Sequence, residues 1–414
     1  MKKSLFPLLF PLSFIITSCY VDDGSSSVIK RNKRYDIALT RSQQEIANEN
    51  VKFAFSLFDK VNELETGQSN WIVSPLSASI ALSMTANGTA GNSQTQIKDA
   101  LGFGRFQMDE VNSYYNYLCN ELIAVDNSTK FNIANSVWLD NDFRYYDSFV
   151  KTNQEMYDAE VATLDLSNES SLKKINDWSA KKTENLIPVI INELADGMDC
   201  CLLNSLYFRA EWDTWFNESL TVDEMFTSSN GKQSQVKMMK KQNINLYYSN
   251  ETFALTEFPF GNSAFSMVVL LPHENCTLEE SLQKFTVDYW SEYQENKMGK
   301  LADLVISFPR FEIEYEKDLS EIMKCLGISD VFDIEKADFS NMTPDHILVS
   351  LVKQAARIKV DEKGCEAAVT TIVEEMYGSP SVPKADFHMN RPFAFLIKEE
   401  STGTILFMGK VTEL

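Results

Sequence analysis

The spacing of apolar residues predicts helices mainly in the first part of the chain and strands mainly in the later part. A helical pattern follows the cap candidates Thr40 and Ser42 and runs through Ile46, Phe53, Leu57 and Val61. Two more helices are predicted, at residues 109–125 and 172–185. Strands are predicted at residues 71–73, 131–139, 160–166, 200–208, 265–271, 304–311, 393–397 and 404–408. Helices and strands that segregate in this way indicate an α+β fold.

One junction between elements is unusually well defined. The short strand 71–73 leads directly into Ser74 and Pro75, where Ser74 suits the N-cap of a helix and Pro75 its first turn. Gly88 is placed to end that helix. After Thr40 the chain has no break rich in Pro, Gly or Ser until the C-terminal region, and no internal repeat. The sequence therefore predicts one domain over residues 40–414.

The N-terminus has the pattern of an export signal. Lys2 and Lys3 precede an apolar run over residues 5–16, which is followed by Thr17, Ser18 and Cys19. This run is shorter than the roughly 20 apolar residues that span a bilayer. Residues 1–18 resemble a bacterial lipoprotein signal, and the resemblance implies that Cys19 carries the lipid. Plain secretion, with Cys19 incidental, is the alternative.

Residues 19–39 are expected to form a flexible tether, because they are polar and show no period. Four basic residues in it form either a solvated linker surface or a protease-sensitive clip: Lys30, Arg31, Lys33 and Arg34. The lipoprotein resemblance places the chain beyond the inner membrane, anchored at the outer membrane or cell surface. The acidic pair Asp22 and Asp23 is compatible with surface display.

Composition excludes several classes of function. With 38 Lys plus Arg against 59 Asp plus Glu, the net charge is −21, which disfavours nucleic-acid binding. The chain has three histidines, His273, His346 and His388, without metal-ligand spacing, and it lacks nucleophile-elbow, phosphate-loop and dinucleotide-binding motifs. Its 7 cysteines are too few for a disulfide scaffold. No catalytic residue, metal or cofactor is therefore expected.

Residues 361–386 contain an unusual loop sequence. The second half collects the turn-forming residues Gly378, Ser379, Pro380, Ser381 and Pro383, which is typical of an exposed tip open to proteolysis. The first half holds two alanines and the β-branched run 369–373 without a proline, so it is competent to form a strand. A strand-competent segment inside so long a loop calls for a functional explanation.

This loop begins with a recognisable motif. Residues 361–368 read DEKGCEAA, which is similar to the serpin hinge pattern E-[EKR]-G-[ST]-E-A-A-A. Further matches to the family follow its order along the chain: 70–77 (NWIVSPLS), 203–212 (LNSLYFRAEW), 308–311 (FPRF), 390–395 (NRPFAF) and 407–411 (FMGKV). The chain thus resembles the serpins over residues 40–414. The resemblance implies helices packed on a large, mostly antiparallel sheet plus smaller sheets, with an exposed reactive-centre loop at about residues 362–386.

The resemblance also implies a function. A target protease, most naturally an elastase-like or chymotrypsin-like serine protease and alternatively a cysteine protease, cuts the loop and is trapped covalently when the loop's N-terminal arm enters the main sheet. The chain would be a monomer and would not be an enzyme. Family spacing places the cleaved bond at Gly378–Ser379, with Tyr377–Gly378 as second choice. The implied hinge residues are Glu362, Gly364, Cys365, Glu366, Ala367 and Ala368. The implied shutter and breach residues, which control opening of the sheet, are Ser74, Ser77, Asn204, Trp212 and Gln354.

Three residues depart from the family pattern. Cys365 replaces the usual Thr or Ser, Val369 is larger than the usual Ala or Gly, and Gln354 stands where many members carry a histidine. With Ser74, Ser77 and Asn204, Gln354 is expected to form a buried amide–hydroxyl network. These departures keep open a non-inhibitory serpin that serves as a binding or carrier lipoprotein. A surface adhesin or nutrient-binding lipoprotein of another fold is the third class.

Overall fold

A computed structural model describes residues 31–65, 70–195, 197–296, 300–365 and 382–414. No helix in these ranges is long and apolar enough to cross a membrane. The α-helices of the described chain are α1 (Arg41–Leu64), α2 (Pro75–Gly88), α3 (Gly91–Ala100), α4 (Met108–Ala124), α5 (Asp147–Tyr157), α6 (Glu169–Lys182), α7 (Leu278–Lys284), α8 (Val287–Asn296) and α9 (Ser320–Cys325).

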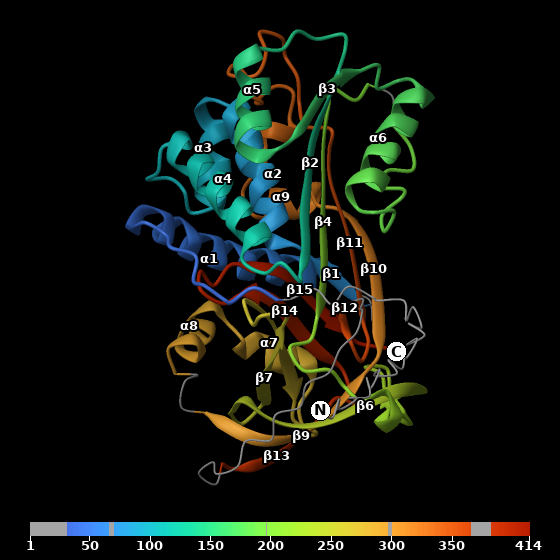
Figure 1. Ribbon diagram of the computed structural model, residues 1–414. Helices are drawn as coiled ribbons and strands as arrows, with labels where there is room; N and C mark the ends of the chain where they lie inside the picture. Colours follow the sequence, from blue (N-terminus) through green and yellow to red (C-terminus); the bar gives the residue numbers. More distant parts are fainter. Residues whose placement is uncertain (1–30, 66–69, 196, 297–299, 366–381) are drawn as a thin grey trace, which may run out of the picture.

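Two sheets organise the described strands (Figure 1). The six-stranded sheet has the order β10-β11-β4-β2-β3, and β12 pairs with β4. Its strands are β10 (Phe311–Asp318), β11 (Leu351–Val360), β4 (Cys200–Glu211), β2 (Lys130–Asp140), β3 (Glu160–Leu164) and β12 (Gly364–Cys365). The nine-stranded sheet has the order β1-β15-β14-β8-β7-β6-β9-β13, and β5 pairs with β6. Its strands are β1 (Trp71–Val73), β15 (Ile405–Val411), β14 (Phe393–Glu399), β8 (Phe265–Pro272), β7 (Phe253–Phe260), β6 (Gln233–Ser249), β9 (Leu301–Pro309), β13 (Lys384–His388) and β5 (Val222–Thr227).

The first helices begin where the sequence predicts. Thr40 caps α1 in a reciprocal capping box with Gln43, whose backbone N–H donates to Thr40 Oγ1 at 3.3 Å. Ser74 caps α2, Pro75 occupies its first turn, and Gly88 is its last residue. Almost every residue of α2 is buried, because the helix lies between the two sheets and the other N-terminal helices. The α+β prediction is confirmed, with both sheets mixed in strand direction.

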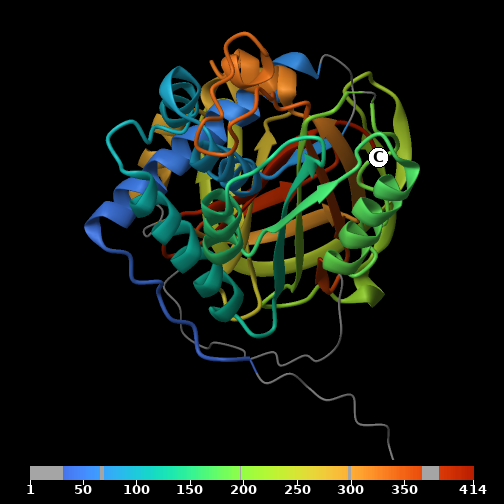
Figure 2. The same cartoon turned by 90° about the horizontal axis from the view of Figure 1, so that it is seen from above.

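The two faces of the six-stranded sheet have separate cores. On one face α6 covers a small cluster in which Trp138 and Trp178 meet edge to face with centroids 5.8 Å apart. The other face belongs to the main core, which continues through α2 and α4 into the nine-stranded sheet. Figures 1 and 2 show α6 on one side of β2 and β4, and the N-terminal helices on the other. A strand added beside the Cys201–Leu203 part of β4 would therefore be covered on both faces.

One predicted strand is two strands. The run 304–311 was expected to be continuous, but β9 ends at Pro309 and β10 begins at Phe311 in the other sheet. Pro309 has no N–H for a ladder. Arg310 still donates its backbone N–H to Lys237 O of β6 at 2.8 Å, and from Phe311 onward the chain pairs with β11 of the other sheet. The bend puts Arg310 between the two sheets.

The expected tether is shorter than predicted. Residues 31–39 belong to the predicted flexible segment 19–39, but they lie against the domain. Ile37 is buried, and its N–H donates to Ser401 Oγ at 2.9 Å. Arg31 is bonded to the domain rather than solvated. The prediction of flexibility is therefore wrong for residues 31–39, and residues 1–30 lie outside the described chain.

Candidate functional site

The central strand β4 has an incomplete neighbour on one edge. Its other edge pairs with β2 along almost its whole length. On the open edge, β11 pairs with β4 in parallel only along Leu351–Ala355 opposite Cys201–Ser205. At the far end, β12 pairs with β4 in antiparallel fashion, Gly364 opposite Glu211 and Cys365 opposite Ala210. Among the described residues, the four positions 206–209 have no ladder partner on that edge, so the sheet is split there.

Trp212 holds the segment that leads into the split. Its backbone N–H donates to Lys363 O at 2.8 Å, and its indole Nε1 donates to Asp361 O at 2.9 Å. The indole is buried and stacks on Phe260 at 4.5 Å with an interplanar angle of 10°. Phe216 adds a third bond, from its N–H to Glu362 O at 2.8 Å. The hinge is thus held mainly through its backbone.

Gly364 is required by this close approach. Its φ of +143° is a conformation that side chains disfavour, and a Cβ there would lie 2.3 Å from Ala210 O and 2.6 Å from Glu211 Cα. Both neighbours are backbone atoms of β4, which cannot swing aside. Only glycine lets the hinge come this close to the edge of β4 and pair with it at Gly364 and Cys365.

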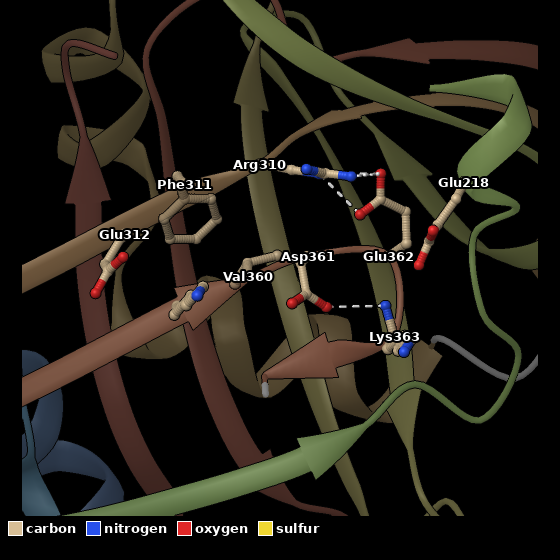
Figure 3. Close-up of a pocket in the computed structure, with 9 residues that line it drawn as sticks. Glu218, Arg310, Phe311, Glu312, Val360, Asp361, Glu362 and Lys363 are labelled. Carbon is tan, nitrogen blue, oxygen red and sulfur yellow. Dashed lines mark hydrogen bonds and ion pairs between the residues drawn. The ribbon is translucent and has the colours of Figure 1, made fainter. Parts of the chain in front are cut away.

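An ion pair between Arg310 and Glu362 fixes the chain two residues before Gly364. Arg310 Nε and Nη2 donate to the Glu362 carboxylate at 2.8 and 2.7 Å, and Thr221 Oγ1 donates to Glu362 Oε1 at 2.5 Å (Figure 3). The Glu362 side chain is only 3% exposed, whereas that of Arg310 is 44% exposed. Burial alone would raise the pKa of Glu362, but the bonds from Arg310 and Thr221 outweigh it and hold that pKa below its ordinary value.

The pair borders an open groove of about 460 Å³ between the ends of β10 and β11 and the hinge. Charged side chains of both signs line it, including Glu218, Lys359 and Asp361. Figure 3 shows Arg310 reaching across to Glu362, with Asp361 turned to the backbone N–H of Lys363. The groove lies at the mouth of the split, so the ion pair fixes the chain where an inserting arm would have to enter.

We expect Glu362→Gln to weaken the hinge in a pH-dependent way. The variant keeps the shape but loses the charge, so at pH 7 its free energy of unfolding should fall by about 2 kcal/mol. A carboxylate whose pKa is lowered on folding stabilises above its unfolded pKa and loses that contribution as the pH falls through its folded pKa. The difference from wild type should therefore shrink below about pH 4.5. Urea unfolding at pH 7 and pH 3.5 measures it.

The matched control is Glu312→Gln. Glu312 of β10 forms a more exposed ion pair with Arg357 of β11. Exposed pairs contribute little to stability, so this variant should unfold like wild type at both pH values. An equal loss in both variants, or a Glu362→Gln loss that is independent of pH, would contradict the role assigned to the buried carboxylate.

The predicted buried network near the other end of the split forms in two parts. The side chain of Gln354 bonds the backbone of Ser74, donating from Nε2 to Ser74 O at 2.9 Å and accepting from Ser74 N at 2.7 Å. Asn204 donates instead to Asn135 Oδ1 at 2.5 Å. Ser77 Oγ has no hydrogen-bond partner within the described chain. The prediction of a single network is therefore wrong in its connections. Gln354 and Asn204 are nevertheless neighbours on β11 and β4, and Gln354 contacts the start of α2, where Ser74 and Ser77 lie.

Sequence reasoning found some of the site residues and missed others. Glu362, Gly364 and the backbone of Cys365, which the resemblance implied as hinge residues, lie beside Trp212. Arg310, Thr221 and Asn135 were missed, although Arg310 stands in a quoted motif directly after Pro309. The remaining expected positions lie outside the described residues: Cys19, Glu366, Ala367, Ala368, Val369, Tyr377, Gly378 and Ser379.

Comparison with known proteins identifies the family to which this chain belongs. The family profile described as Serpin (serine protease inhibitor) matches residues 48–414. The chain belongs to the serpin family. It is 30% identical over 379 residues to the leukocyte elastase inhibitor of Equus caballus, covering 89% of this chain and 99% of that protein. It is 28% identical over 386 residues to Serpin B3 of Homo sapiens, covering 88% of this chain and 98% of that protein.

Solved serpin structures share the fold. The thermophilic serpin tengpin in its native state superposes with a TM-score of 0.82 at 29% identity, covering 93% of this chain and 98% of tengpin. Human thyroxine-binding globulin bound to thyroxine superposes with a TM-score of 0.81 at 26% identity, covering 90% of this chain and 99% of that chain. In this serpin, no group of three or more His, Cys, Asp or Glu side chains within the described ranges is arranged to hold a metal ion.

Proposed function

We propose that this serpin is a protease inhibitor that is consumed as a suicide substrate. The protease cuts the loop between β12 and β13, and the N-terminal arm of the loop then enters the split beside β4. Elastase-like or chymotrypsin-like serine proteases are the proposed targets, with cysteine proteases as a further class. The chain itself performs no catalysis in this scheme.

The observation that carries the proposal is the state of β4's open edge. β11 leaves β4 after Ser205, and Gly364 and Cys365 are already paired at the other end. The arm thus has its first two residues in the position from which a new strand would grow. Continuing the same register, residue 375 would lie opposite Cys200, so residues 364–375 match the whole of β4, Cys200–Glu211.

Strand direction favours the insertion. In the resting structure β11 and β4 are parallel neighbours. An arm that continues from β12 would run antiparallel to both, so it would replace one parallel pairing by two antiparallel ones. Antiparallel pairing is slightly more stable per residue, and the split edge gains the hydrogen bonds that it lacks.

The chemistry needed from the protease is ordinary acyl transfer. Its nucleophile attacks the carbonyl of the residue before the cut, the peptide bond breaks, and the amine of the following residue leaves with a proton. An acyl-enzyme then links the arm to the protease. If the arm inserts before water hydrolyses this link, the protease is carried along the sheet, by roughly 3.3 Å for each inserted residue.

Incubation with a panel of serine and cysteine proteases tests the proposal. A covalent complex on denaturing gels is expected with at least one of them, together with a released C-terminal fragment. Cleavage of the loop without any complex, across the whole panel, would favour the non-inhibitory alternative. Val369 is the residue that favours this alternative. In the continued register it would lie opposite the buried Leu206, and because it is larger than the usual residue there it would slow insertion.

The cleaved bond is expected to be Gly378–Ser379, with Tyr377–Gly378 as the second choice. A small residue before the bond fits a shallow, elastase-like pocket, whereas a tyrosine fits a chymotrypsin-like one. Mass spectrometry of the C-terminal fragment decides between them. A fragment that starts outside residues 378–381 would show that the family spacing does not hold in this chain.

We further propose that Cys19 is lipidated and anchors the serpin to a membrane on the far side of the inner membrane, at the outer membrane or cell surface. The support is the short apolar segment that ends at Ser18. Cys19→Ala should release the protein from the membrane fraction or block its processing. Cys276→Ala, at another partly exposed cysteine, is the control and should fractionate like wild type. Unchanged fractionation and processing of Cys19→Ala would refute the anchor.

A further inference from the structure

The N-terminal segment bonds the end of β4 through one arginine. Arg31 Nη1 donates to Gly261 O at 2.9 Å and to Asp213 O at 3.2 Å, and Nη2 donates to Trp212 O at 3.2 Å. Nη2 also lies 3.5 Å from Glu211 Oε2. The guanidinium therefore contacts three successive residues at the end of β4, the first of which is paired with the hinge, and also the turn after β7.

The same residues hold the hinge from their other side. Trp212 accepts from Arg31 at its carbonyl and donates to Lys363 at its N–H, so one peptide segment is bonded to both. Glu211 lies opposite Gly364 in the register. Gly261 belongs to the nine-stranded half of the molecule, so Arg31 also ties the end of β4 to that half. A displacement of β4 beside the split would have to strain or break these bonds.

Beyond Arg31 the chain is open to proteases. Asn32 is bonded to Val125 O and to Asn127, but the next four residues, 33–36, are all exposed. Two of these four are basic, Lys33 and Arg34. A cut after either one would leave Arg31 on the fragment that is no longer joined to the domain. The chain re-enters the core only at Ile37.

We infer that residues 31–36 form a cleavable strap that restrains the hinge, with Lys33–Arg34 as the cleavage site of a trypsin-like protease. Hydrolysis adds water across the peptide bond after Lys33 or Arg34. It leaves a carboxylate on the fragment that carries Arg31, and an amino group on Arg34 or Tyr35 of the domain. Only the hydrogen bonds of the cleaved fragment then hold Arg31 on the end of β4. When that fragment dissociates, the hinge loses the restraint that Arg31 provides. This site is separate from the bait loop, whose residues 364–383 contain no Lys or Arg.

The purified full chain in detergent allows a direct test with trypsin, because trypsin has no site between residues 364 and 383. Brief digestion should give, as its first product, a domain that begins at Arg34 or Tyr35, identified by N-terminal sequencing. Hydrogen exchange should then be about tenfold faster at the amides of Trp212 and Phe216, which donate to the hinge, corresponding to the loss of about one charge-assisted hydrogen bond.

Two variants separate the clamp from the cut. Arg31→Gln should speed exchange at Trp212 and Phe216 without any cleavage. The double variant Lys33→Gln, Arg34→Gln keeps Arg31, so it should resist trypsin at positions 33 and 34 and exchange like wild type. The exchange measurement needs neither a target protease nor insertion of the arm, so it remains decisive if the proposed inhibition fails. Wild-type exchange rates in Arg31→Gln, or a strap that trypsin leaves intact while it cuts elsewhere, would overturn the inference.

Discussion

Ala367→Arg is expected to turn the proposed inhibitor into an ordinary substrate. Continuing the pairing of Gly364 with Glu211 and Cys365 with Ala210 places residue 367 opposite Phe208, on the face of β4 that joins the main core. Phe208 packs against Phe260 and Phe265, each with centroids 5.5 Å away. An unpaired arginine inserted there would cost several kcal/mol, about 3–5 by comparison with broken buried ion pairs. Insertion would then lose its race against hydrolysis of the acyl-enzyme.

The readouts are the fraction of protease found in covalent complex and the heat resistance of the cleaved protein. Wild type should form complexes and become markedly more heat-resistant after cleavage, because its sheet gains a strand. The variant should be cut at the same bond, with no complex and little gain in heat resistance.

Ala368→Arg is the matched control. Residue 368 falls opposite Tyr207 on the other face, near Arg209 and the exposed pair of Lys130 with Glu184, so its side chain can reach solvent. This variant should keep most of the inhibition. If Ala367→Arg traps protease as well as wild type does, strand insertion is not the mechanism.

The local pattern predicts much of this fold because its signals depend on neighbours in the chain. The capping box at Thr40 and the Ser74–Pro75 start of α2 need only residues within one turn, and both are observed. The run 304–311 shows the limit. Its apolar residues look continuous, but the sheet that each half joins depends on a distant partner strand. The first half pairs with β6, more than fifty residues earlier in the chain, and the second half pairs with β11, about forty residues later.

The site was predictable where a backbone requirement selects one residue type. Gly364 is such a case, because any Cβ would collide with β4. The ion pair of Arg310 with Glu362 was not predictable, because the partners are 52 positions apart and meet only when both sheets have formed. The pairing of Gln354 with Ser74 rather than Asn204 has the same origin: a long amide reaches the backbone at the cap of α2, and Asn135 from β2 takes the place beside Asn204.

Gly364→Ala is expected to detach the hinge from β4. The added Cβ would meet Ala210 O at 2.3 Å, Glu211 Cα at 2.6 Å and Trp212 N at 2.8 Å. Real Cβ atoms do not approach backbone so closely, so the hinge must move away and Trp212 loses its bond to Lys363 O. Strain and overpacking together should lower the free energy of unfolding by about 2–3 kcal/mol. Urea unfolding and hydrogen exchange at Trp212 measure the two effects.

Gly403→Ala separates the collision from the backbone strain. Gly403 also has a positive φ, +72°, but nothing lies within 4 Å of the Cβ that it would gain. That variant should lose only about 1 kcal/mol, and the exchange of Trp212 should stay at the wild-type rate. In the proposed mechanism insertion starts from the hinge, so Gly364→Ala should also form fewer protease complexes, whereas Gly403→Ala should form them normally. Equal behaviour of the two variants would mean that the close contact of Gly364 with β4 does not hold the hinge in place.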